Sequence, residues 1–239
     1  MHNLDLKDKV LKGNDTYTDK VFNIKDGIQV KLLVSPLVLN VNTDKKGYDA
    51  QDAKTPKHLK RSPFEKASSD ELEIVKSYSE EQKANLFEIY DEYHQKIQKS
   101  IDELKQKNGF ALILDGHALA SRAPTDRPDK AGEKRADFVM GTLDDKSAHP
   151  DVIKSFYDAL KKQADAHGFS IKKNYPYKGG YITQNYGKPE ENVHVIQLEV
   201  SKAVYMDEEN LSLNPERVLV LHSIISDIMN KTFEAVSDI

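Results

Sequence analysis

Between residues 80 and 114 an apolar stripe at helical spacing runs directly into a short apolar segment, and this order strongly constrains the fold. Ser79 and Gln82 form a capping box, and Asn108-Gly109 supplies a left-handed stop, so we predict a helix over Glu80–Lys107. FALIL at 110–114 is continuously apolar, which is typical of a buried parallel strand. The helical stripe consists of Leu86, Ile89, Tyr90, Tyr93, Ile97, Ile101 and Leu104.

Helical and strand-like segments also alternate along the rest of the chain. A second predicted helix begins at Pro150 and stops at Gly168, and a last helix begins at Asn214-Pro215. Predicted strands cover 28–35, 37–41, 169–173 and 193–200. This alternation predicts an α/β fold with a mixed, largely parallel sheet flanked by helices. We find no composition break, so we predict one domain over residues 1–239, with long polar loops at 43–66 and 118–135.

Composition excludes several classes of protein. Lys and Arg number 35 against 39 Asp and Glu, a formal net charge of −4, so no basic surface for nucleic acid is expected. With no cysteine, disulfides, thiol nucleophiles and Cys-rich zinc sites are excluded, and any metal must be held by His, Asp or Glu. No stretch approaches the roughly 18 apolar residues of a membrane span, and no signal peptide is recognisable. We therefore expect a cytoplasmic protein without a membrane partner, whose oligomeric state the sequence leaves open.

The predicted strand at 110–114 is followed at once by Asp115-Gly116-His117. In open α/β sheets ligands bind at the carboxyl ends of the strands. A neutral imidazole at such a place can bind zinc, and Asp115 is close enough in sequence to orient His117. The alternative is an aspartate that caps a loop beside an exposed histidine.

The segment VHVIQLEV at 193–200 carries polar side chains inside an apolar strand. Alternation places Gln197 and Glu199 on the same face, where burial requires a partner or a ligand for each. Desolvation would favour a general-base role for Glu199. The alternative is a solvated edge strand.

A glycine-containing loop, NYPYKGGY at 174–181, follows another predicted strand. Gly179-Gly180 permits close approach of the backbone to a ligand, although a flexible turn has the same composition. The loop at 118–135 adds Arg122, Arg127 and Arg135, each able to clamp a carboxylate. The motifs of serine hydrolases, dinucleotide-binding enzymes and phosphate-loop hydrolases are missing from the sequence.

Taken in order, four segments resemble motifs of the N-formylglutamate amidohydrolase family. ALILDGHALASR resembles its strand with Asp-x-His, and KRADFVMGT its Arg-x-Asp-Phe-x-x-Gly segment. NYPYKGGYITQNYG resembles its Asn-x-Pro-x-x-Gly-Gly-Tyr loop, and VHVIQLEVSKAVYMDEE its Gln-Ile-Glu strand with the Tyr-Met-Asp-Glu that follows. The resemblance covers most of the chain, from about Asp15 to the last predicted helix.

The resemblance implies a zinc-carboxypeptidase-like sheet and metal-dependent hydrolysis of an N-acyl amino acid, such as N-formylglutamate, to glutamate and formate in histidine breakdown. It implies that His117 is a zinc ligand and Glu199 the catalytic general base. It also implies that Arg135, Asn174, Gly179 and Gly180 bind the acidic small-molecule substrate.

Three departures from the family pattern favour an alternative function. The chain has no His-Ser-Gly, the motif that ends the family's first strand and supplies another metal histidine, so we expect that strand to be missing. Asn40, Asn42 and Thr43 stand where the family has Asp-x-Asn-Arg, and Ser201-Lys202 replaces Asn-Arg. The alternative is a diverged, catalytically impaired member that binds an acidic or N-acylated metabolite without hydrolysing it.

Overall fold

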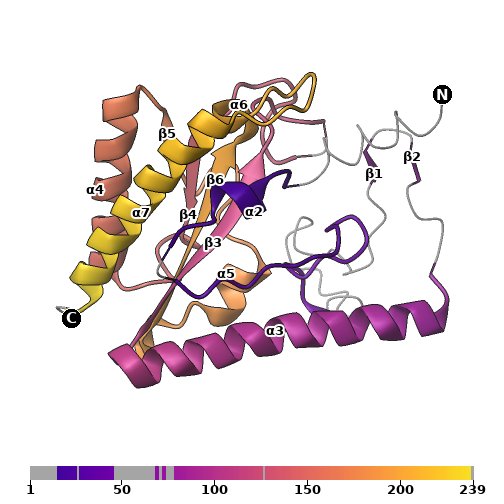
Figure 1. Cartoon of the computed structure of the whole chain (residues 1–239), viewed down its shortest axis with the longest axis horizontal. Helices are drawn as coiled ribbons and strands as arrows, with labels where there is room; N and C mark the ends of the chain where they lie inside the picture. Colours follow the sequence, from indigo (N-terminus) through magenta and orange to yellow (C-terminus); the bar gives the residue numbers. More distant parts are fainter. Residues whose placement is uncertain are drawn as a thin grey trace. The chain divides into compact units, whose positions relative to one another are not determined.

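The computed structural model describes residues 15–25, 27–45, 68–69, 72–73, 78–125 and 127–237 (Figure 1). The chain divides into two compact units, Met1–Asp15 with Ile28–Ser100 and Thr16–Gly27 with Ile101–Ile239, and each is described by itself. This division does not test the predicted single domain, which stays a prediction. None of the helices among the described residues is long and apolar enough to cross a bilayer.

The long helix α3, Glu80–Asn108, confirms the first helix prediction. The Ser79 N–H donates to Oε1 of Gln82 at 2.9 Å, and the Gln82 N–H donates to Oγ of Ser79 at 3.1 Å. This reciprocal capping box satisfies backbone donors that the first turn leaves unpaired. Gly109 ends the helix with φ of 84°, a left-handed conformation that glycine adopts without strain.

The two strands predicted at 28–35 and 37–41 do not form, and this prediction was wrong. The N–H groups of Val38 and Leu39 both donate to the Ser35 carbonyl, at 2.8 and 3.0 Å. The backbone therefore makes a turn at Pro36 instead of a sheet ladder. The predicted long loop 43–66 is described only up to Lys45, and the rest of it lies outside the described residues. The first unit also holds the short antiparallel pair β1, Ser68–Ser69, and β2, Leu72–Glu73.

The second unit contains a mixed four-stranded sheet, which confirms the predicted α/β class. Its strands are β3, Ala111–Leu119, β4, Phe138–Gly141, β5, Ile171–Lys173, and β6, Val193–Ser201. Their order is β3-β6-β4-β5. The outer pairs β3–β6 and β4–β5 are parallel, and the central pair β6–β4 is antiparallel. The four-residue β4 was not predicted as a strand.

Helices α4, Pro150–His167, and α7, Pro215–Ser237, confirm the two later helix predictions. Figure 1 shows them packed side by side to one side of the sheet, with α5, Tyr181–Tyr186, on the other side. The short elements are α2, Thr18–Val21, η3, Pro189–Glu191, and α6, Lys202–Tyr205. The core is formed by fully buried side chains of the sheet and the long helices, including Phe138, Met140, Phe156, Leu160, Leu198, Ile225 and Ile228.

Strand alternation gives the sheet one apolar and one polar face. Gly116 of β3 faces the Phe22 side chain at the end of α2, so close that a Cβ on this glycine would lie 2.7 Å from the ring. Residues one position along the strands point to the opposite face, where α5 lies. We call this opposite side, defined by Asp115, His117, Gln197 and Glu199, the polar face. Its four side chains are the ones singled out from the sequence.

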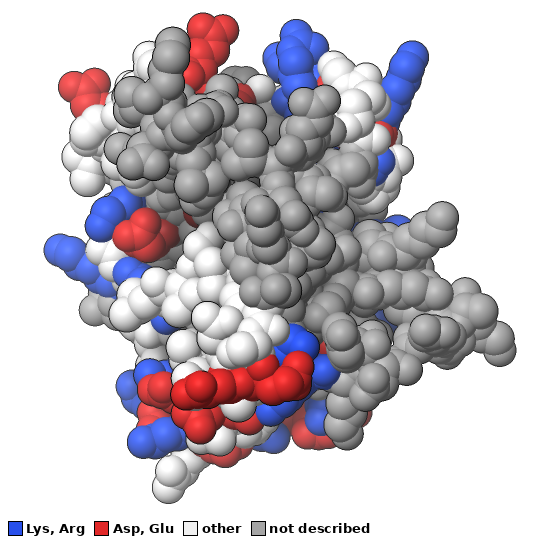
Figure 2. Space-filling view, turned by 90° about the vertical axis from the view of Figure 1, so that its right-hand side faces the viewer, with Lys and Arg blue, Asp and Glu red and all other residues white. Residues whose placement is uncertain are grey.

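The described surface mixes charges of both signs. Figure 2 shows Lys and Arg side chains lying among Asp and Glu side chains on the described part of one side of the molecule. Pairs one helical turn apart, such as Lys96 with Glu92 on α3 and Lys161 with Asp165 on α4, contribute to this mixture. The pattern agrees with the small formal charge of −4.

Candidate active site

Strand β3 does not end before Asp115-Gly116-His117 but continues through it to Leu119. Every residue of β3 has a register partner on β6, with Asp115 opposite Gln197 and His117 opposite Glu199. The parallel ladder satisfies the backbone of a segment whose Asp-Gly composition is typical of a turn. Since residues opposite one another share a face, the register brings both predicted pairs of polar side chains together.

Strand β6 is an interior strand, so the alternative of a solvated edge strand is wrong. All nine of its residues are buried, with Gln197 3% and Glu199 7% exposed. Neighbours β3 and β4 flank it on either side, and Val139 of β4 lies opposite Glu199. Burial of a carboxylate at the centre of a sheet requires polar partners.

Gln197 supplies one such partner for Glu199. Its Nε2 donates to Oε1 of Glu199 at 3.2 Å, and its Oε1 accepts the Gly180 N–H at 2.8 Å. A backbone N–H can only donate, so this contact fixes the amide orientation and directs the donor end at the carboxylate. The predicted glycine Gly180 therefore belongs to the same hydrogen-bonded chain as the predicted base.

Asp115 and His117 form a second chain beside the first. Nε2 of His117 lies 3.0 Å from Oδ1 of Asp115, and the Thr183 hydroxyl of α5 donates to Oδ2 at 3.2 Å. The carboxylate thus contacts the imidazole and a helix on the polar face, as expected for a residue that orients His117. The His117 side chain is 18% exposed, more than that of Asp115 at 7%.

The loop 174–180 is tied to the end of β4. Asn174 has a left-handed backbone, and its Oδ1 accepts the Thr142 N–H at 2.8 Å. Gly141 allows the backbone of Lys178 to approach the end of β4 closely, because a Cβ at residue 141 would lie 2.8 Å from the carbonyl carbon of Lys178. Gly179 has φ of 128°, which side chains rarely adopt. Asn174 and Gly179 therefore fix the path by which the chain reaches Gly180.

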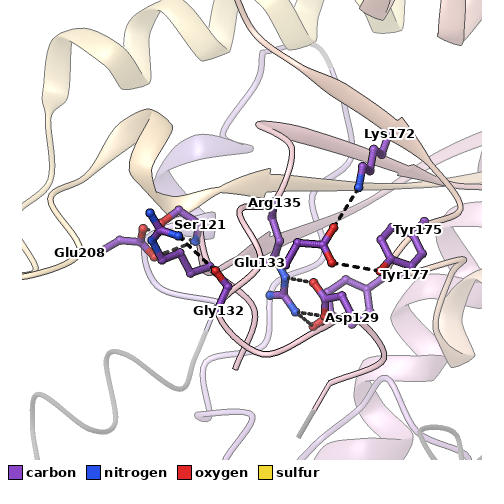
Figure 3. A network of polar contacts seen from close by, with 10 residues as sticks. Ser121, Asp129, Gly132, Glu133, Arg135, Lys172, Tyr175, Tyr177 and Glu208 are labelled. Atoms are coloured by element: carbon purple, nitrogen blue, oxygen red, sulfur yellow. Dashed lines mark hydrogen bonds and ion pairs between the residues drawn. The ribbon is translucent and has the colours of Figure 1, made fainter. Parts of the chain in front are cut away.

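Arg135 lies in a buried ion pair with Asp129 (Figure 3). Its Nε and one terminal nitrogen donate to the two carboxylate oxygens at 2.7 and 2.8 Å. Both residues are 5% exposed. Burial alone would raise the pKa of Asp129, but the hydrogen bond and charge of Arg135 hold that pKa below its usual range. The edge of the guanidinium formed by Nε and this nitrogen therefore already binds a carboxylate of the protein itself, that of Asp129.

Tyr177 was not singled out from the sequence, but it joins Arg135 to the polar face. The Arg135 nitrogen that contacts Asp129 also donates to the Tyr177 hydroxyl at 3.1 Å. The tyrosine ring packs on a cluster of Leu119, Ala136 and Val139. Asp129 and Thr183 were missed as well: the partner of Thr183 is 68 residues away, and no local pattern marks Asp129 although Arg135 is only six residues further along.

The other sequence-derived positions serve different parts of the chain. Arg122 is exposed and donates to the Gly132 carbonyl at 3.1 Å. Lys202, which stands in place of the family arginine, is buried at the start of α6. Asn40, Asn42 and Thr43 lie in the first unit, where the Tyr90 hydroxyl donates to the Thr43 carbonyl at 2.7 Å.

The described residues do not complete a zinc site. A catalytic zinc normally takes three protein ligands, and within the described ranges no group of three His, Asp or Glu side chains is placed to hold a metal ion. His117 contributes an imidazole, but its Nε2 already contacts Asp115. The predicted zinc ligand set is therefore incomplete in this part of the chain.

Comparisons with known proteins agree with the resemblance. The profile of the N-formylglutamate amidohydrolase family matches residues 3–206. The chain is similar to N-formylglutamate deformylases of Pseudomonas putida, 33% identical over 54% of this chain and 46% of that protein, and of Pseudomonas aeruginosa, 35% identical over 55% and 47%. The chain thus spans about half the length of the curated relatives that it matches.

A solved structure shows the same fold. The crystal structure of N-formylglutamate amidohydrolase from Ralstonia eutropha JMP134 superposes with a TM-score of 0.68 at 18% identity, covering 96% of this chain and 84% of that one. The family profile covers well over half of the chain, including the segments that build the polar face. The chain therefore belongs to the N-formylglutamate amidohydrolase family.

Proposed function

We propose that this protein hydrolyses the amide bond of an N-acyl amino acid, with N-formylglutamate as the substrate and glutamate and formate as the products. The observation that carries the proposal is the buried Glu199, oriented by Gln197 and opposite His117 in the β3–β6 register. The names of the curated relatives support the choice of substrate. The reaction would belong to histidine breakdown in the cytoplasm, as expected from the family resemblance and from the composition.

In the first step, Glu199 acts as the general base. Its carboxylate accepts a proton from a water molecule whose oxygen forms a bond to the formyl carbon, giving a tetrahedral intermediate. The Nε2 donor of Gln197 binds one carboxylate oxygen and so orients the carboxylate for this step. General-base assistance of this kind contributes roughly 10²- to 10⁴-fold in rate.

In the second step, the same residue acts as the general acid. Protonated Glu199 returns its proton to the amide nitrogen and the carbon–nitrogen bond breaks. Formic acid, which carries the hydroxyl group from water, leaves and loses its proton to solvent to become formate. The amine of glutamate takes up a further proton from solvent. Glu199 ends as the carboxylate, so the site is restored for another cycle.

Zinc is part of the proposed site, with His117 as the ligand that the described residues supply. The described residues hold no complete ligand set for it. When bound, a zinc ion would polarise the formyl oxygen and lower the pKa of water.

A second candidate function is binding of the same class of acidic metabolite without hydrolysis. Two observations favour it: the described residues hold no complete zinc ligand set, and Thr43 is at the position of a family arginine. Such a protein would be stabilised by N-formylglutamate in a thermal melt while releasing no formate.

The direct test is incubation of the purified chain with N-formylglutamate and assay of both products. Equal amounts of formate and glutamate, growing with enzyme concentration, would support hydrolysis. Thermal stabilisation without either product would favour the binding function. The absence of both stabilisation and product formation would contradict both proposals.

A further inference from the structure

We propose that the Tyr177 hydroxyl donates a hydrogen bond to the α-carboxylate of the N-acyl amino acid substrate, and that Asp129 and Arg135 act as positioning residues for it. The proposal rests on the proposed hydrolase function and adds the group that recognises one end of the substrate.

The Tyr177 hydroxyl has a hydrogen left to donate. Among the described residues it makes one hydrogen bond, with the Arg135 guanidinium at 3.1 Å. A guanidinium has only donors, so the tyrosine oxygen is the acceptor there. Its own O–H is therefore available to an acceptor outside the described protein contacts. A phenol in this arrangement is suited to an anionic acceptor.

The orientation of the phenol is fixed by the protein. Its ring packs on Leu119, Ala136 and Val139, and the Arg135 guanidinium lies 5.3 Å from the ring centroid. Figure 3 shows Arg135 facing Asp129, with Tyr177 beside the pair. Asp129 binds two nitrogens of the guanidinium and so fixes the one that reaches Tyr177. A preorganised donor loses little entropy when a ligand binds.

The surroundings of the hydroxyl fit a carboxylate close to the reacting amide. Burial is the main influence on the pKa of Tyr177 and raises it, which keeps the phenol protonated near neutral pH. The positive charges of Arg135 and Arg127 lower this pKa, and the negative charge of Glu199 raises it. Val139, beneath the ring, lies opposite Glu199 in the sheet.

The nearness of Glu199 selects between the two carboxylates of N-formylglutamate. The α-carboxylate is on the carbon that carries the scissile amide nitrogen, whereas the side-chain carboxylate is two methylenes further away. A donor beside the general base therefore reaches the α-carboxylate. Because the Arg135 guanidinium binds Asp129, Arg135 acts on the substrate carboxylate through its hydrogen bond to Tyr177.

The test compares Tyr177→Phe with the wild type on two substrates, N-formylglutamate and its α-carboxamide. Loss of a hydrogen bond to a charged group should lower kcat/KM for N-formylglutamate by roughly tenfold to hundredfold, mainly through KM. The α-carboxamide, which lacks the charge, should lose much less. Tyr175→Phe is the matched control, because Tyr175 is in the same loop, is exposed, and contacts Glu133 at 3.5 Å.

Binding measurements separate this proposal from the proposed hydrolysis. Calorimetric titration with N-formylglutamate should show the same weakening in Tyr177→Phe whether or not the chain turns the substrate over. If the wild type binds or hydrolyses N-formylglutamate and Tyr177→Phe behaves identically on both substrates, the Tyr177 contact is overturned while the hydrolase proposal stands. If Arg135→Lys weakens binding and Tyr177→Phe does not, the arginine itself is the carboxylate ligand and the proposal is also overturned.

Discussion

Gln197 donates a hydrogen bond from Nε2 to Oε1 of Glu199, two residues along the same interior strand, at 3.2 Å. Its other end accepts the N–H of Gly180, at the start of α5. One buried side chain therefore couples the glycine loop to the candidate base. The candidate site is accordingly a connected network, in which a change at Gln197 is transmitted to the Glu199 carboxylate.

Gln197→Met should impair catalysis without removing the general base. We expect kcat/KM to fall by roughly tenfold to hundredfold, since a donor to a buried carboxylate is lost. Steady-state kinetics with N-formylglutamate would measure this loss. Gln184→Met, on the exposed side of α5, is the control, and equal kcat/KM values for the two variants would contradict the role of Gln197.

Asp129→Ala should destabilise the fold strongly, because it leaves the buried Arg135 guanidinium unpaired. Removal of one partner of a buried ion pair costs about 3–5 kcal/mol in the free energy of unfolding. Urea denaturation followed by circular dichroism would measure the loss. Asp165→Ala, which removes an exposed pair with Lys161 on α4, should cause no measurable change. Equal stability of the two variants would show that the Asp129–Arg135 pair is not buried as described.

His194 should make the stability of the protein depend on pH in the mildly acidic range. The side chain is 3% exposed, and burial, with repulsion from His149, lowers its pKa below the usual value. The folded pKa is thus below the unfolded value of about 6.5, so the unfolded chain binds the proton first as pH falls. Stability contributed by neutral His194 is complete above about pH 6.5 and decreases below it, until the folded form is protonated too.

Denaturation at several pH values would isolate this contribution. Nδ1 of His194 accepts the His149 N–H at 3.3 Å, and an asparagine can accept through its side-chain oxygen. Between pH 6.5 and 5, we expect the stability of the wild type to decrease more steeply than that of His194→Asn. The difference approaches about 1.4 kcal/mol per pH unit for one proton. Parallel slopes for the two proteins would refute the assignment.

Metal analysis of the purified chain tests the zinc part of the proposal. If His117 is a ligand, elemental mass spectrometry should find about one zinc per chain, lost in His117→Gln and retained in His167→Gln, an exposed histidine on α4. Zinc that persists in His117→Gln would remove His117 from the ligand set. A metal-free wild type that still hydrolyses N-formylglutamate would contradict zinc dependence.

The sequence predicted those parts of the site that depend on local pattern. The spacing of Gln197 and Glu199 placed both on one face of a strand, and the buried β6 confirms it. Asp115 and His117 were expected beyond the end of a strand, because the apolar run ends at residue 114, yet pairing with β6 keeps them inside β3. Local composition could not show that β6 continues beside β3 as far as Leu119.

Long-range contacts explain what the sequence did not predict. Tyr177 and Arg135 are 42 residues apart and meet only when the loop 174–180 packs against β4. Arg135 was expected to bind substrate, and the sequence contained no sign that Asp129 would occupy its fork. The four-residue strand β4 is too short to produce an alternation pattern, although it forms the central antiparallel pair of the sheet.

The most direct test of the account is the rate of formate release from N-formylglutamate by the wild type and by Glu199→Gln, with Glu234→Gln on the exposed side of α7 as control. Glutamine preserves the shape of the buried side chain but cannot accept a proton from water. We predict that Glu199→Gln folds as the wild type does and loses roughly 10²- to 10⁴-fold in kcat, while the control keeps full activity. Formate release by Glu199→Gln at the wild-type rate would contradict the assignment of Glu199 as the general base.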